Sequence, residues 1–172
     1  MAALPELEEP LSLTVVGTEF MKPFFSASLA ILALTVTAHA TEPVSVGDLI
    51  VEHAWARATP PSAPTGAVYL TIANNGSEAD QIVAIETPVA GYAMAHTTEI
   101  QDGVSRMREA RPLEIAPGAT LEMKPGGTHV MLMDLTTDLE AGDEITVTIT
   151  FDKAGTVEVP VEVGAIGAMG PE

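Results

Sequence analysis

Two histidine–methionine pairs are the residues of this sequence best suited to hold a metal ion. The first pair is His96 and Met107, and the second is His129 and Met131. They belong to a dense group of potential ligands between residues 94 and 133, namely Met94, His96, Met107, Met123, His129, Met131 and Met133. Outside this group, residues 41–172 contain only His53 and Met169 as further histidine or methionine.

The sequence predicts that the first pair meets across a β-hairpin. Asp102-Gly103 is a strong signal for a two-residue hairpin loop. Such a loop pairs Met107 with Thr98 and His96 with Glu109, so His96 and Met107 become diagonal neighbours on one face, roughly 7–8 Å apart. A loop longer or shorter by one residue would put them on opposite faces.

The second pair shares a face by strand alternation. His129, Met131 and Met133 are separated by single residues, and successive side chains of a strand point to opposite faces. His129 follows the turn signal Pro125-Gly126-Gly127 and is therefore expected at a sheet end, where a metal ion can enter. The two pairs together predict a site with two imidazole and two thioether ligands.

The donor types select copper(I). Thioether sulfur is soft and prefers copper(I) to zinc, magnesium or calcium. It carries no proton, whereas each histidine must be neutral to bind a metal. A site with no anionic ligand favours the monovalent ion and release over storage.

Other members of the group have a simpler explanation as packing residues. Met123 and Met133 are expected in the core, because methionine is a common core filler. Met94 shares the strand face of His96, and packing is preferred there to a role as auxiliary ligand. His53 is expected to be a structural histidine. Glu99, Asp102 and Glu109 are interpreted as solvated strand and turn residues.

The elements that position these residues are short strands separated by turn signals, with hardly any helical periodicity. Ile145, Val147, Ile149 and Phe151 alternate with threonines, which is typical of a half-buried strand. This pattern predicts one all-β domain, an antiparallel Greek-key β-sandwich. The other expected strands are Leu49–Ala58, Ala67–Ala73, Gln81–Glu86, Ala93–Ile100, Val104–Ala110, Leu113–Ile115, Ala119–Met123, His129–Leu135 and Thr156–Val163.

The N-terminal part has the features of an export signal. A basic start at Met21-Lys22-Pro23, an apolar run over residues 24–36 and Ala38-His39-Ala40 predict a signal peptide over 21–40, cleaved after Ala40. Residues 1–20 are acidic, which a signal start is not, and are interpreted as a mis-annotated start or a leader. Residues 41–172 are then the single mature domain, without a membrane span, and GAIGAMGPE at its end is expected to be a frayed tail.

Composition excludes several functions. The 172 residues include 24 acidic and 7 basic ones; without residues 1–40 the counts are 20 and 6, a net charge near −14. So acidic a surface argues against nucleic acid and anionic membranes as partners. The absence of cysteine excludes thiolate zinc sites, iron–sulfur clusters, a thiol nucleophile and a blue-copper centre.

At this point the sequence resembles the periplasmic copper(I) chaperone family called PCuAC. The family pattern is a His, ten residues, a Met, twenty-one residues, a His, one residue and a Met, which His96, Met107, His129 and Met131 match without adjustment. The segments HAWARATPPSAPTGAVYLTIAN, DGVSRMR and PGGTHVMLMDL are similar too, so the resemblance covers about residues 44–163.

The resemblance implies a cupredoxin-like sandwich that carries copper(I) in the periplasm, without catalysis. It also implies copper donor or acceptor proteins as partners, and delivery to the dinuclear copper centre of a cytochrome c oxidase subunit. The tail departs from members with His- and Met-rich tails, since it offers only Met169. Two other hypotheses stay open: a redox copper protein, and a secreted metal-free interaction module.

Overall fold

The structure is a computed structural model, and it describes residues 42–171. The leader predicted at 1–20 and the signal peptide predicted at 21–40 lie outside the described residues. Residues 42–171 form strands and turns, with no helix among them. No helix long and apolar enough to cross a membrane is therefore found in this part of the chain. Its strands are β1 (Val44–Val46), β2 (Leu49–Arg57), β3 (Thr65–Asn74), β4 (Asp80–Glu86), β5 (Ala90–Gln101), β6 (Val104–Glu109), β7 (Leu113–Ile115), β8 (Thr120–Glu122), β9 (Thr128–Leu135), β10 (Glu144–Phe151) and β11 (Gly155–Gly164).

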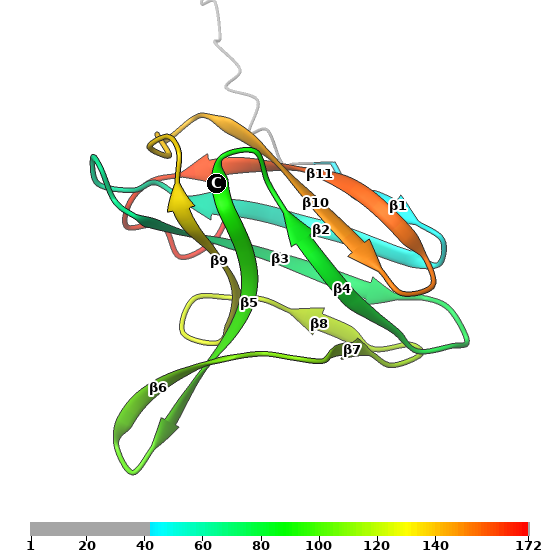
Figure 1. Ribbon diagram of the computed structural model, residues 1–172. Helices are drawn as coiled ribbons and strands as arrows, with labels where there is room; N and C mark the ends of the chain where they lie inside the picture. Colours follow the sequence, from blue (N-terminus) through cyan, green and yellow to red (C-terminus); the bar gives the residue numbers. More distant parts are fainter. Residues whose placement is uncertain (1–41, 172) are drawn as a thin grey trace, which may run out of the picture. The chain divides into compact units, whose positions relative to one another are not determined.

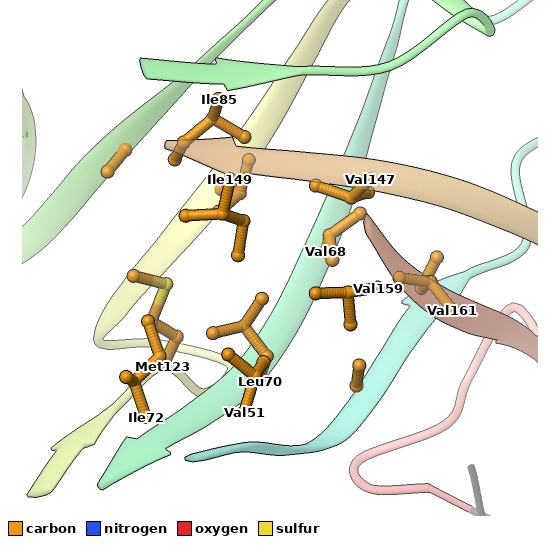
Figure 2. Close-up of a cluster of buried hydrophobic side chains, with 14 of the residues drawn as sticks. Val51, Val68, Leu70, Ile72, Ile85, Met123, Val147, Ile149, Val159 and Val161 are labelled. Atoms are coloured by element: carbon orange, nitrogen blue, oxygen red, sulfur yellow. The ribbon is translucent and has the colours of Figure 1, made fainter. Parts of the chain in front are cut away.

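The strands pair in one continuous order that folds over a single core. The order is β6-β5-β9-β3-β2-β11-β10-β4-β7, with β1 beside β2 and β8 beside β3. Buried side chains of β2 and β3 face those of β10 and β11, as Figure 2 shows for Val51, Val68, Val147 and Val159. The protein is thus an all-β, cupredoxin-like sandwich, and the predicted fold class is confirmed. One pairing differs from a purely antiparallel arrangement, because β11 lies parallel to β2.

Alternation along β10 accounts for one wall of this core. Ile145, Val147, Ile149 and Phe151 are buried, at 8%, 0%, 1% and 2% exposure, while the residues between them are exposed or half-buried. Removing an apolar side chain from water contributes about 1.5–3 kcal/mol each. The strand pattern predicted from the sequence is therefore the pattern that closes the sandwich.

Strands β5 and β9 also have one core face and one outer face. Val130 and Leu132 of β9 are fully buried in the core, and Ala95 of β5 is buried beside them. Because side chains alternate, the neighbours of these residues in the sequence, His129 and Met131 among them, lie on the other face. The core face thus fixes which side of the sheet carries the predicted ligands.

His53 is not the structural histidine that was expected. Its side chain is 67% exposed, and its nearest charged partner is Glu52, at 3.9 Å. The register of β2 against β3 shifts between Glu52 and Trp55, and His53 has a φ of 54°. This irregularity turns His53 outward, as bulges do, so the structural role expected for it was wrong.

The C-terminal segment is anchored, in contrast to the frayed tail expected from its sequence. The Arg57 guanidinium donates to the Ala168 carbonyl from Nε at 3.1 Å and from Nη2 at 2.7 Å. The same guanidinium lies 5.9 Å from the ring centroid of Trp55 and 5.7 Å from that of Tyr69. These contacts hold the chain as far as Met169, whose sulfur lies 3.7 Å from Nη2.

Candidate metal centre

The β5–β6 hairpin has the predicted loop and register. Asp102 and Gly103 have φ values of 55° and 77°, the left-handed backbone that a two-residue type I′ loop requires. Thr98 pairs with Met107, and His96 pairs with Glu109. His96 and Met107 therefore lie on one face as diagonal neighbours, as predicted. The hairpin extends away from the other strands (Figure 1).

The second edge of β5 brings the two histidines together. β5 pairs with β9 so that His96 lies directly opposite His129, and Met94 lies directly opposite Met131. The imidazole centroids of His96 and His129 are 6.4 Å apart. All four predicted ligands thus share one face across β6, β5 and β9. β5 is the middle strand of the three.

The imidazole of His129 is held by its surroundings. Its exposure is 7%, and the Tyr69 ring lies 6.2 Å away on the side of β3. Nδ1 of His129 is 2.9 Å from the carbonyl oxygen of Gly127, which can only accept, so Nδ1 carries the proton. That tautomer leaves Nε2 with its lone pair available for a metal ion.

The carbonyl of Gly127 also binds the facing strand. It accepts a hydrogen bond from the backbone N–H of Thr98 at 3.2 Å. Beside it, the hydroxyls of Thr97 and Thr128 are 2.9 Å apart. The turn before β9 therefore fixes both the tautomer of His129 and the position of the part of β5 that carries His96.

His96 has a nitrogen without a protein partner. Its Nδ1 is buried and makes no hydrogen bond within residues 42–171. A buried polar atom that is left unpaired costs about 1–3 kcal/mol. An atom of this kind beside a second imidazole with a free Nε2 fits a metal ligand better than a structural role.

The two methionines of the set differ in exposure. Met131 is half-buried between β3 and β5, opposite Ala67. Met107 lies on β6, the edge strand of the sheet, and is 52% exposed. A metal ion at this centre would therefore be reached from the side of β6.

Two carboxylates near the candidate site are paired with arginines. Glu109, opposite His96, accepts from Nε of Arg111 at 2.7 Å, and Glu99 binds Arg108. Within residues 42–171 no group of three or more His, Cys, Asp or Glu could hold a metal ion. The two histidines on this face are accompanied by methionines, whose thioether sulfur is a donor suited to copper(I).

The other three methionines between residues 94 and 133 have different surroundings in the structure. Met123 is buried in the core at 3% exposure, as expected. Met133 is half-buried on the same face as Met131, opposite Tyr92, and is not part of the core cluster, so the expectation of a core residue was wrong. Met94 lies beside the centre. The Met-Ala-His spacing of residues 94–96 was the sequence signal for it.

Comparisons with known proteins agree with this architecture. The family described as "Putative lipoprotein LpqE-like" matches residues 49–163. The putative lipoprotein Lxx21020 of Leifsonia xyli subsp. xyli is 34% identical over 133 residues, which are 76% of this chain and 79% of that protein.

Solved structures with the same fold carry the PCuAC name or a copper ion. The apo PCuAC domain from PmoF1 is 31% identical, with a TM-score of 0.62 over 72% of this chain and 99% of that one. The solution structure of CuI-DR1885 from Deinococcus radiodurans is 30% identical, with a TM-score of 0.55 over 77% of this chain and 85% of that one. On the family match, and on the likeness to PCuAC domains, the chain belongs to the LpqE-like (PCuAC) family.

Proposed function

We propose that this protein binds one copper(I) ion through His96, Met107, His129 and Met131 and carries it to a partner protein. The observation that carries the proposal is the pairing of His96 opposite His129, with a methionine of each predicted pair on the same face. The buried unpaired Nδ1 of His96 and the free Nε2 of His129 supply two nitrogen donors.

The chemistry of the donors supports copper(I) as the cargo. Two neutral imidazoles and two thioethers leave the occupied site at net +1, whereas copper(II) would leave +2 in a partly buried place, at a higher cost of desolvation. The structure of the similar protein DR1885 from Deinococcus radiodurans was solved in the copper(I) form. The exposure of Met107 supports release to a second protein, because an acceptor can reach this ligand first.

A carrier without catalysis accounts for the site better than the two other hypotheses. A redox copper protein of the blue-copper class needs a cysteine thiolate, which the sequence lacks. A metal-free interaction module gives no reason for an unpaired buried imidazole nitrogen. Relatives with the PCuAC fold include one in a copper(I) state.

We place the protein outside the cytoplasm, in the periplasm. The predicted signal peptide over 21–40 and the family description as a putative lipoprotein both support export. The proposed acceptor is a copper protein of the same compartment, and we propose the dinuclear copper centre of cytochrome c oxidase as the destination. Transfer of copper(I) from the loaded protein to the isolated copper-binding domain of that oxidase subunit tests this step.

The binding proposal is tested by titrating the exported protein with copper(I) against a chromophoric chelator. The wild type is expected to take up one equivalent and to prefer copper(I) to zinc. His129→Ala removes one nitrogen donor, and its copper(I) affinity should fall by a factor of at least about 100. Met169→Leu is the matched control, since Met169 is 74% exposed and outside the set. Equal uptake by wild type and His129→Ala would refute the site.

A further inference from the structure

The register of β5 and β9 provides one more thioether than the proposed site uses. Met94 lies directly opposite Met131, as His96 lies opposite His129. Met94 precedes His96 by two residues, and Met131 follows His129 by two. In this antiparallel pair, Met94 and Met131 therefore have equivalent positions relative to the two histidines. Each lies on the same face as the histidines and two residues from one of them along its strand.

The dimensions of a β-sheet place Met94 within reach of the histidines. Directly opposite residues have Cβ atoms about 4.5–5.5 Å apart, and diagonal neighbours about 7–8 Å. Met94 is diagonal to His129, just as Met107 is diagonal to His96. A methionine side chain has three rotatable bonds and adapts to a distance of this kind.

Met133 does not have this position. It is four residues from His129, about 13 Å along the strand at about 3.3 Å per residue. It lies opposite Tyr92. Met133 shares the face and the partial burial of Met94 and Met131 but is one step too far from the histidines, so it provides a matched control.

The three thioethers near the histidines differ in what holds them. Met94 and Met131 are half-buried, and each lies on a strand with a paired strand on both sides. Met107 is 52% exposed on edge strand β6. A protein that docks to take copper would meet Met107 first and the other two later.

We infer that Met94 is a reserve ligand, which takes the place of Met107 when an acceptor displaces it. The copper ion then stays bound to two imidazoles and two thioethers while Met107 moves away. No proton or electron is transferred, because thioethers are neutral and the ion remains copper(I). This inference rests on the proposed copper(I) function and names the first ligand exchange in the transfer of the copper ion to an acceptor.

The test counts sulfur ligands by X-ray absorption at the copper edge in the copper(I)-loaded wild type and in five variants. Met107→Leu should keep two sulfur neighbours and lose only about tenfold in affinity, since Met94 replaces the lost donor. Met94→Leu alone should bind as the wild type does. The double variant Met94→Leu/Met107→Leu should keep one sulfur and lose about 100-fold beyond the product of the single effects.

Met133→Leu, alone and combined with Met107→Leu, is the control. It should change neither the number of sulfur ligands nor the effect of Met107→Leu on copper(I) affinity. One sulfur in Met107→Leu, or a double variant no weaker than Met107→Leu, would overturn the role of Met94. Failure of the proposed function looks different: the wild type would then take up no copper(I), or His129→Ala would bind as well as the wild type. Circular dichroism of each variant confirms that the fold is retained.

Discussion

Two polar clusters of this domain differ in how completely the fold uses their hydrogen-bonding atoms. At one, buried Asp80 accepts from three backbone N–H groups: Gln81 at 2.7 Å, Lys153 at 3.0 Å and Ala154 at 2.8 Å. At the other, His96 Nδ1 is buried with no partner in the described chain, and His129 has one nitrogen free. The first cluster ties β4 to the turn between β10 and β11. The second cluster leaves ring nitrogens of His96 and His129 without hydrogen bonds, and the stability of the fold does not require this.

Structural and functional polar residues can be distinguished by whether their hydrogen-bonding atoms are all used. A buried group whose bonds are all made stabilises the fold and has little left to offer a ligand. A buried group with an unused donor or acceptor costs stability, and an external partner can repay that cost. Substitutions in the two clusters should therefore affect different quantities.

The largest expected effect is on copper at the histidine cluster. His96→Leu replaces an imidazole with an apolar side chain of similar size, so copper(I) affinity should fall about 1000-fold, or about 4.1 kcal/mol. The free energy of unfolding should change by less than about 1 kcal/mol, because no hydrogen bond is lost. Chelator competition and urea unfolding measure the two quantities. A loss of stability larger than that of Asp80→Ala would contradict the contrast between the clusters.

The second effect is on stability at the carboxylate cluster. Asp80→Ala leaves three backbone N–H groups without an acceptor, and unfolding should become easier by about 3 kcal/mol. For a domain of this size the midpoint of thermal unfolding should fall by about 10 °C. Copper(I) affinity should not change. Asp143→Ala, at an exposed position, is the control and should shift stability by less than about 0.5 kcal/mol. Loss of copper binding in Asp80→Ala would contradict the assignment of a purely structural role to the Asp80 cluster.

The smallest effect is a pH dependence that only one cluster should show. Burial by itself raises the pKa of Asp80, but the backbone hydrogen bonds from Lys153, Ala154 and Gln81, with the Lys153 charge, outweigh it and hold the pKa below the ordinary value of an aspartate. A lowered carboxyl pKa stabilises the fold fully above the unfolded value, and this stabilisation is lost as pH falls below about 4 through the folded value.

Asp80→Asn removes this titration. The difference in unfolding free energy between wild type and Asp80→Asn should therefore be constant from pH 7 to about 5 and should shrink below about pH 4. Urea unfolding at several pH values measures it. A difference that grows on acidification would show that the sign assigned to Asp80 is wrong.

Local patterns in the sequence were enough for the strands and for half of the site. The alternation at Ile145–Phe151 and the Asp102-Gly103 loop depend on neighbours in the chain, so both the strand and the His96–Met107 face could be derived from them. The pairing of β5 with β9 joins residues more than thirty positions apart. The position of Met94 opposite Met131 follows only from that pairing, which no local pattern encodes.

The predictions that were wrong also depended on contacts between distant parts of the chain. Met133 was expected in the core because methionine usually packs there, but its face is set by Val130 and Leu132, which are the core residues of β9. His53 was turned outward by an irregularity in β2, and the tail was held by Arg57, a residue more than a hundred positions away. Each outcome depends on tertiary contacts that override local preference.

The shared carbonyl of Gly127 connects the candidate metal centre to the backbone of β5. It accepts from the ring of His129 and from the amide of Thr98 at once. When Nε2 binds a cation, Nδ1–H becomes a stronger donor, and the electron density of that carbonyl is drawn toward the ring. The Thr98 amide competes for the same oxygen, so its nuclear magnetic resonance should shift on metal binding although the amide touches no metal. A nitrogen–proton correlation spectrum could then follow loading and unloading of the site through a single backbone signal.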